Sequence, residues 1–364
     1  SICSVSAISL LLECVGKDGL ICPKCGGPIL WNDPQATWVD TAPEKREFRG
    51  YHIPQPVTPM CHRVAPNGKR DWDQLLLKIK RYPRAKLHNE VFCESFDYGS
   101  KPITETELIA SQVSGWTMSS EQLMQAMQMS GEPVYTGIDW GGKEEDRGLA
   151  ASGGTSYTVI TLGCYFLAPD AQAGKFFEFY WHRFTGREED PELQLSRIYD
   201  LLRGFNVRMA VCDYGMGHYQ NKWLISRLGP QHVVRLQFAG KQNAGKLVWR
   251  PKLGWYTGHK SAVCSDYISA IKEKKILLPE WAAFANPYGE DFTNLRGEYN
   301  ARMNETRYIN HAGSTVDSFF SGLYCLVASM RDYPRPDITS LVVDYEDADP
   351  MALEDPSSLA WMTT

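Results

Sequence analysis

The sequence contains no apolar run long enough to cross a membrane as a helix. Its longest apolar segments, Ile8–Leu12 and Phe319–Leu326, fall far short of the roughly 18 residues that a spanning helix needs. The first apolar stretch has neither a basic lead nor a small-residue cleavage site, so no secretory signal peptide is expected. These absences predict a protein that is soluble, with no membrane contact, and not secreted.

Positive charge is not in excess either. The chain has 38 Lys and Arg against 43 Asp and Glu, a net charge of -5, which does not indicate a nucleic-acid binder by overall charge. An enzyme that gathers carboxylates around metal ions can nevertheless be acidic overall and carry a local basic groove. A nuclease is therefore not excluded.

Internal repeats and low-complexity tracts are also missing, and 364 residues exceed one ordinary compact domain. Residues 1–130 are irregular and rich in proline, and they predict a linker or subdomain. Residues 131–335 have a regular pattern of strands and helices. Residues 336–364 are acidic and punctuated by proline, which predicts a solvated C-terminal tail. Because the chain opens at Ser1 directly into an apolar stretch, we expect a fragment of a larger protein.

The regular region predicts a mixed α/β sheet. Apolar alternation indicates strands at Val134–Ile138, Tyr157–Phe166, Lys175–Phe184, Arg208–Cys212 and Val233–Phe238. Helical periodicity indicates helices at Asp190–Arg203, Tyr219–Leu228, His259–Lys274 and Thr315–Met330. The first three strands are joined by loops too short for parallel crossovers and must be antiparallel, whereas the later strands can pair in parallel. This order is the RNase H-like arrangement, with helices on both faces.

Three aspartates stand where such a sheet places its chemistry. Asp139 and Asp213 each follow a predicted strand, and Asp317 lies in the first turn of the last helix. The carboxyl ends of parallel strands meet at one edge, where open α/β sheets bind ligands. Any one of these residues could instead form a turn or cap a helix, but together they match a cluster for two-metal phosphodiester hydrolysis. We therefore predict Asp139, Asp213 and Asp317 as catalytic metal ligands.

The segment from Tyr135 to Met330 resembles the nuclease domain of the large terminase subunit of tailed bacteriophages. The resemblance lies in Thr136–Gly141, Ala210–Gly215 and Ser314–Phe319. Upstream, the stretch that joins motor and nuclease in lambda-like terminases is similar to Cys22–Gly26, Arg49–His52, Leu87–Glu90 and Pro102–Thr104. Together these segments span about nine-tenths of the chain, although each motif is short.

The resemblance implies an endonuclease that cuts concatemeric double-stranded viral DNA during genome packaging in the host cytoplasm. The cofactors implied are two Mg²⁺ or Mn²⁺ ions, with Asp139 contacting both and Asp213 and Asp317 holding one each. The implied partners are double-stranded DNA, the small terminase subunit and the portal protein. Some members have a histidine three residues before the third aspartate, where this chain has Ser314, with His311 farther back.

The ATPase motor of that family has no counterpart in this sequence. No G-x-x-x-x-G-K-[ST] pattern occurs, and the nearest string, Gly254–Ser261, has the wrong spacing. We therefore expect no ATP hydrolysis by this chain.

Two secondary sites are predicted. Basic residues interleaved with Trp249, Trp255 and Tyr256 suit phosphate contact along a groove, although a solvated loop is an equal alternative; the predicted DNA-binding residues are Lys241, Lys246, Arg250, Lys252 and Lys260. Cys22 and Cys25 resemble half of a Zn²⁺ knuckle, with Cys14 as a third ligand and Cys3, His52 or Cys61 as the fourth. Incidental cysteines on a glycine turn are the alternative.

Three other functions remain open. The turn at Gly137–Gly142 is also similar to the first phosphate turn of actin-like sugar kinases, but a second glycine-rich phosphate turn is not evident. Another RNase H-fold nuclease or a transposase would use three carboxylates as well, although transposases more often have Glu as the third. Finally, the domain could be an inactive scaffold that docks on DNA or a portal.

Overall fold

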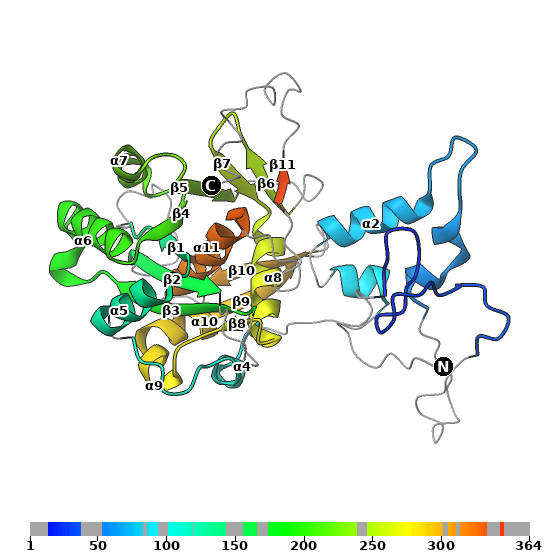
Figure 1. The fold of residues 1–364 in the computed structure, drawn as a ribbon, viewed down its shortest axis with the longest axis horizontal. Helices are drawn as coiled ribbons and strands as arrows, with labels where there is room; N and C mark the ends of the chain where they lie inside the picture. Colours follow the sequence, from blue (N-terminus) through cyan, green and yellow to red (C-terminus); the bar gives the residue numbers. More distant parts are fainter. Residues whose placement is uncertain are drawn as a thin grey trace. The chain divides into compact units, whose positions relative to one another are not determined.

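The chain forms two compact units, residues 1–97 and 98–364. The computed structural model describes residues 14–37, 53–82, 86–93, 101–118, 120–142, 156–165, 174–238, 246–300, 305–310, 314–332 and 343–345. Figure 1 shows both units with their helices and strands labelled.

The first unit is built from short elements around a small apolar core. They are the turns η1 (Gln55–Val57), η2 (Pro59–His62) and η3 (Leu87–Val91) and the helix α2 (Asp71–Arg81). The helix has acidic residues in its first turn and basic residues in its last, as the helix dipole favours. Its apolar side contributes Trp72 and Leu75 to a core that also contains Leu20, Leu87, Val91 and Phe92.

The boundary between the units lies earlier than the predicted one at residue 130. Helices α4 (Glu105–Ala110) and α5 (Ser120–Ser130) belong to the second unit. Hydrogen bonds tie the intervening segment to that unit, among them Ser111 Oγ to the Ile271 carbonyl (2.7 Å), Val113 N to the Leu278 carbonyl (2.8 Å) and Trp116 Nε1 to the Phe179 carbonyl (3.3 Å). The residues at the predicted boundary, Gly131–Pro133, therefore follow the end of α5 and do not separate domains.

A nine-stranded sheet forms the centre of the second unit, in the order β11-β6-β7-β5-β4-β1-β2-β3-β8. The predicted strands are β1 (Val134–Asp139), β2 (Val159–Tyr165), β3 (Phe176–Arg183), β4 (Val207–Asp213) and β5 (Val233–Phe238). Strands β1, β2 and β3 pair antiparallel, while β1, β4 and β5 pair in parallel. This confirms the predicted RNase H-like mixed sheet.

Several strands were not expected from the sequence. The basic segment after β5 is not wholly a loop, because β6 (Leu247–Arg250) and β7 (Trp255–Gly258) form an antiparallel hairpin, with β7 parallel to β5. Part of the predicted solvated tail forms β11 (Val343–Tyr345), which pairs in parallel with β6. The remaining strands are β8 (Ile276–Leu277), parallel to β3, and the separate antiparallel pair β9 (Leu295–Asn300) and β10 (Glu305–Asn310).

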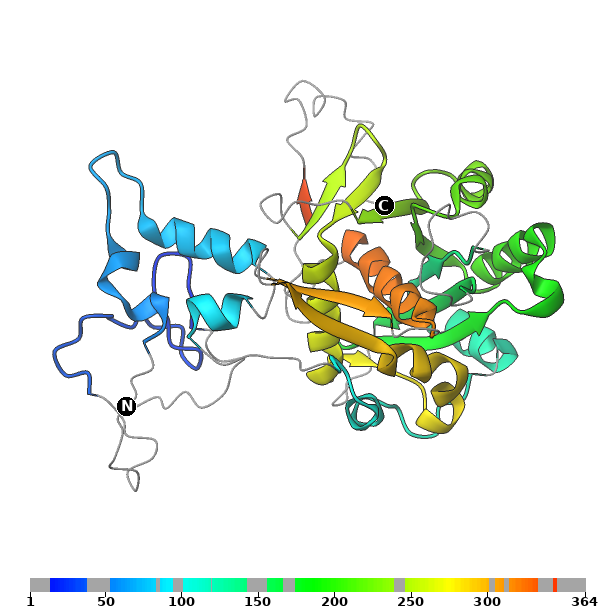
Figure 2. The same cartoon turned by 180° about the vertical axis from the view of Figure 1, so that it is seen from behind.

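Helices cover both faces of the sheet (Figures 1 and 2). On one face, α6 (Pro191–Gly204) and α7 (His218–Leu228) enclose a core that includes Ile138, Ile160 and Cys212. On the other face, α11 (Asp317–Asp332) lies against β1 and β2. The remaining elements of the unit are η5 (Gly186–Glu189), α8 (Lys260–Lys272), α9 (Trp281–Phe284), η6 (Ala285–Gly289) and α10 (Glu290–Thr293).

The contact between α11 and β1 is unusually close because Gly137 has no side chain. A Cβ atom at Gly137 would overlap the Ser321 carbonyl oxygen and the Cys325 nitrogen. The small Ser321 side chain uses the space by donating to the Gly137 carbonyl (3.0 Å) and by hydrogen-bonding Thr161 Oγ1 (2.8 Å). This approach holds the start of α11 at the end of β1.

Among the described residues, no helix is long and apolar enough to span a membrane.

A buried carboxyl group on β3 is held in its neutral form. Glu178 is fully buried, and the Tyr267 hydroxyl donates to its Oε2 atom (2.7 Å). Its Oε1 atom has no hydrogen-bond partner among the described residues. Burial raises the pKa of Glu178 to about 8 from its ordinary value of 4.5. The folded chain therefore keeps this proton at neutral pH.

We predict that Glu178 makes stability fall as pH rises. The unfolded chain releases the proton above pH 4.5, whereas the folded chain holds it to about pH 8, so each pH unit in this window costs at most about 1.4 kcal/mol. Glu178→Gln, which stays neutral, should flatten the dependence and raise Tm at the upper end of the window. Thermal melts across the window measure this. The exposed Glu192→Gln is the control, and parallel curves for the parent and Glu178→Gln would contradict the prediction.

Candidate active site

The ends of β1 and β4 place two of the predicted aspartates side by side. Ile138 pairs with Cys212 in the parallel register, so the residues that follow, Asp139 and Asp213, leave the sheet at the same edge. Because strand side chains alternate, Asp139 lies on the same face as Gly137, which is the face that α11 covers. Both aspartates are half-buried.

Two backbone donors orient the Asp213 carboxylate. The N–H groups of Gly215 (2.9 Å) and Met216 (3.0 Å) donate to its Oδ2 atom, and the Tyr324 hydroxyl of α11 is near enough to lower the pKa of Asp213 as well. Burial raises the pKa of Asp213, while these hydrogen bonds act to lower it. The carboxylate is therefore held in one place by the backbone at the strand end.

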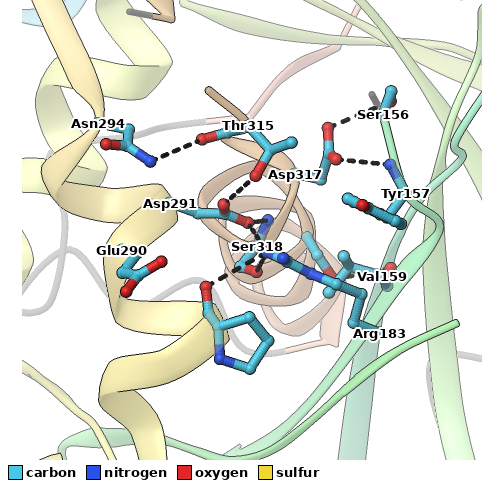
Figure 3. A network of polar contacts seen from close by, with 12 residues as sticks. Ser156, Tyr157, Val159, Arg183, Glu290, Asp291, Asn294, Thr315, Asp317 and Ser318 are labelled. Atoms are coloured by element: carbon cyan, nitrogen blue, oxygen red, sulfur yellow. Dashed lines mark hydrogen bonds and ion pairs between the residues drawn. The ribbon is translucent and has the colours of Figure 1, made fainter. Parts of the chain in front are cut away.

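Asp317 is the first residue of α11 and is only 8% exposed. Its two oxygens accept hydrogen bonds from Tyr157 N (2.7 Å) and Ser156 Oγ (3.3 Å), as Figure 3 shows. Burial raises the pKa of Asp317 to about 6, against the effect of the Tyr157 N–H group. The residues that precede β2 thus orient this side chain.

The three predicted aspartates are close enough to affect one another's ionisation. Burial raises the pKa of Asp139 well above its ordinary value, and the negative charges of Asp317 and Asp213 raise it further. The Lys260 ammonium group, at the start of α8, acts in the opposite direction. A cluster of like charges of this kind is relieved by a bound cation.

Within the described residues, no three His, Cys, Asp or Glu side chains form a closed group around one metal position. This does not conflict with the aspartate cluster. Mg²⁺ keeps several waters and is usually bound by one or two carboxylates together with substrate phosphates, whereas Zn²⁺ and Ca²⁺ take more complete sets of protein ligands. The carboxylate donors thus suit Mg²⁺ or Mn²⁺ and do not form a closed cage.

Asp291 of α10 is a fourth aspartate at the site that the sequence did not reveal. It is 1% exposed and also raises the pKa of Asp139 and Asp317. It accepts from Arg183 Nη2 (2.6 Å), from Ser318 N (2.8 Å) and from the Thr315 hydroxyl. Figure 3 shows it beside the start of α11. Because its oxygens are occupied by these donors, we assign it to positioning Asp317. In the sequence, Glu290 and Asp291 resemble an ordinary solvated pair.

Asn221 of α7 is a second residue that sequence reasoning missed. It is fully buried and accepts from the Trp140 indole N–H (2.9 Å) while donating to the Asp213 carbonyl (2.8 Å). One side-chain amide therefore joins the residue after Asp139 to the backbone of Asp213. No sequence signal exists for it, because its partners are distant in the chain.

The predicted DNA-binding residues have different surroundings. The prediction for Lys246 is wrong, because this residue is 1% exposed and its ammonium group is paired with buried Asp266 at 2.8 Å. Lys252 is exposed between β6 and β7, where Arg250 is half-buried. Lys260 is exposed, with its Nζ atom 4.6 Å from the centre of the Phe320 ring. Lys241 lies outside the described residues.

Two backbone hydrogen bonds close the cysteine turn in the first unit. Gly26 N donates to the Cys22 carbonyl (2.7 Å), and Cys22 N donates to the Gly27 carbonyl (2.7 Å). Cys14 and Cys22 are buried, whereas Cys25 is exposed. No group of three metal-binding side chains forms here among the described residues, and Cys3, His52 and His311 lie outside them. Zn²⁺ binding stays a prediction.

No known protein-family model and no curated protein sequence matches the chain. Among solved structures it is similar to the large terminase nuclease from the thermophilic phage G20c, with a TM-score of 0.36, 12% identity, and coverage of 54% of this chain and 83% of that chain. It is also similar to the HK97 bacteriophage large terminase, with a TM-score of 0.38, 10% identity, and coverage of 72% of this chain. The chain spans about half (51%) of the HK97 protein. At these identities no side-chain role is transferred from them.

We predict that Asp291 and Arg183 are energetically coupled. Asp291→Leu leaves a largely buried guanidinium without its anion and should cost about 3–5 kcal/mol, and Arg183→Met should cost at least as much because it leaves the Asp291 carboxylate, which is 1% exposed, without its cation. The double variant should lose less than the sum of the two. Urea unfolding of the four proteins measures the coupling. The surface pair Glu273–Lys275 is the control and should couple by less than about 1 kcal/mol. Additive losses at Arg183 and Asp291 would refute the positioning role.

Proposed function

We propose that the chain is a metal-dependent endonuclease that hydrolyses phosphodiester bonds of double-stranded DNA. The observation that carries this proposal is the gathering of Asp139, Asp213 and Asp317 from β1, β4 and α11 at one sheet edge, where their charges raise the pKa of Asp139. Crowded carboxylates repel one another and so reduce the stability of the fold. Their presence at one site is explained if they bind cations, which relieve this repulsion.

The three carboxylates would hold Mg²⁺ or Mn²⁺, whose preferred ligands are oxygens of this type. When bound, such ions stabilise negative charge on a phosphate and lower the pKa of a water molecule. The chain itself contributes orientation. The N–H groups of Gly215 and Met216 fix Asp213, and that of Tyr157 fixes Asp317, so little reorganisation is needed when substrate binds.

Lys260 adds a positive charge beside the carboxylates. Because the Lys260 charge lowers the pKa of Asp139, its ammonium group lies near that carboxylate. This exposed group could therefore contact a phosphate bound at the site. Arg250 and Lys252 of the β6–β7 hairpin would contact the DNA backbone farther along, where such contacts fix register and not sequence.

The biological setting that we propose is cleavage of concatemeric viral DNA during genome packaging in the host cytoplasm. The resemblance of Thr136–Gly141, Ala210–Gly215 and Ser314–Phe319 to the terminase nuclease motifs supports it. Under this proposal the partners are the small terminase subunit and the portal protein, and ATP hydrolysis belongs to a motor not contained in this sequence.

The glycines after Asp139 favour this function over a sugar kinase. A Cβ atom at Gly141 would overlap the backbone of Tyr157 and Thr158, and one at Gly142 would overlap the Met216 side chain. In addition, Gly141 N donates to Thr158 Oγ1 (3.0 Å). Gly141 is therefore explained by packing against backbone, and its N–H group is not free to hold a phosphate.

The purified chain should nick and linearise supercoiled plasmid with Mg²⁺ or Mn²⁺ and be inactive with EDTA. Asp139→Ala, Asp213→Ala and Asp317→Ala should each reduce the rate by more than about 100-fold, since even residues that only orient a metal ligand account for 10–100-fold. Their folds should persist because carboxylate repulsion is relieved. Gel densitometry of the plasmid forms gives the rates.

Asp200→Ala, an exposed aspartate on α6, is the matched control and should cut at the parental rate. Parental rates for all three site variants would show that the site is assigned wrongly. If the chain does not cut DNA with either metal but binds ATP in a calorimetric titration, the result would instead support the kinase-like alternative.

A further inference from the structure

Arg235 lies on β5 with its guanidinium group against two aromatic rings. Its Cζ atom is 4.8 Å from the ring centre of Trp255 and 5.2 Å from that of Tyr214. The two rings contact each other with centroids 5.0 Å apart. Tyr214 directly follows Asp213, so this stack adjoins the candidate active site.

The guanidinium group has no hydrogen-bond acceptor or ion-pair partner among the residues that the structure describes, and its buried Nε atom is left unsatisfied. This contrasts with Arg183, which is paired with Asp291. A half-buried arginine without an acceptor is unfavourable for the protein alone. The five N–H groups of arginine form a planar fork that matches an anion with two oxygens.

The sheet register places Arg235 in a row of basic and aromatic side chains. Arg235 pairs with Cys212 on one side and with Trp255 on the other, and Trp255 pairs with Arg250 across the hairpin. Residues in register on neighbouring strands share a face and lie about 4.8 Å apart. The row Arg250, Trp255, Arg235 therefore runs across three strands to Cys212, on the face of the sheet opposite α11 and the three aspartates. It ends beside Tyr214, which directly follows Asp213 in the chain.

We propose that Arg235 is a phosphate-binding residue for DNA that binds a backbone phosphate beyond the one that is cut, where the DNA passes the end of β4 beside Tyr214. The proposal rests on the proposed nuclease function for its substrate. Stacking on Tyr214 and Trp255 holds the planar group in place, which leaves its in-plane N–H groups for the two oxygens of a phosphate. Lysine could not reproduce this contact, because it lacks both the plane and the fork.

The test is the affinity of the full chain for a short DNA duplex, measured by fluorescence anisotropy in EDTA between roughly 50 and 200 mM salt. Arg235→Gln should weaken binding about tenfold at the low-salt end and reduce the slope of log K against log salt by about 0.9, the value for one lost phosphate contact. Arg235→Lys should keep the slope and lose several-fold in affinity. The matched control is Arg208→Gln, which removes the same charge from an exposed position at the other end of β4 and should change neither quantity.

Parental affinity for Arg235→Gln, or an equal loss for Arg208→Gln, would overturn the assignment. An affinity loss with an unchanged slope would also overturn it, because the contact would then not be with a phosphate. If Arg235→Gln has a lowered Tm, the assignment is tested with Arg235→Lys alone, since this variant keeps the charge and the aliphatic stem. Parental affinity for Arg235→Lys would then overturn the assignment. The assay contains no metal, so its outcome is independent of whether the plasmid assay shows cleavage.

Discussion

The contact between α11 and β1 is the constraint on which the candidate site depends. Because Gly137 lets the Ser321 backbone approach the strand directly, the helix start and the strand end are placed together. From Ser321 back to Asp317 the helix advances one turn, about 6 Å. From Gly137 forward to Asp139 the strand advances about 6.6 Å. Both carboxylates thus arrive at the same edge of the sheet.

That placement has an electrostatic cost, which the surroundings partly offset. Three of the four carboxylates accept hydrogen bonds: Asp213 from two backbone N–H groups, Asp317 from one, and Asp291 from Arg183. Asp139 has the charges of its neighbours around it and Lys260 as the opposing cation. The site is therefore rigidly arranged but electrostatically incomplete in the chain alone, which is the condition in which a divalent cation binds strongly.

The sequence was sufficient to predict the parts of the fold with long, regular patterns. Strands β1 to β5 and helices α6, α7 and α11 follow apolar alternation or periodicity, and the positions of Asp139, Asp213 and Asp317 follow from where those elements end. Short strands such as β6, β7 and β11 were not predicted, because three or four residues carry too little pattern.

Residues whose role depends on a distant partner could not be found from the sequence. Asp291, Asn221 and Arg235 act through contacts with residues far away in the chain. The same limit explains the error at Lys246, whose neighbourhood in the sequence is basic and exposed in character. Only the fold shows that Asp266 of α8 neutralises it in the interior. Local composition predicts elements, whereas pairing of charges is a property of the folded chain.

The parallel pairing of β11 with β6 changes which strand forms the edge of the sheet. Without Val343–Tyr345, β6 would be the outermost strand, with a row of unpaired backbone N–H and C=O groups open to other chains. Its apolar Leu247 and Val248 would make that edge attractive for pairing. A segment whose composition suggests an appendage therefore replaces β6 at the edge of the sheet with a strand of three residues, and so short an edge offers few unpaired backbone groups to another chain.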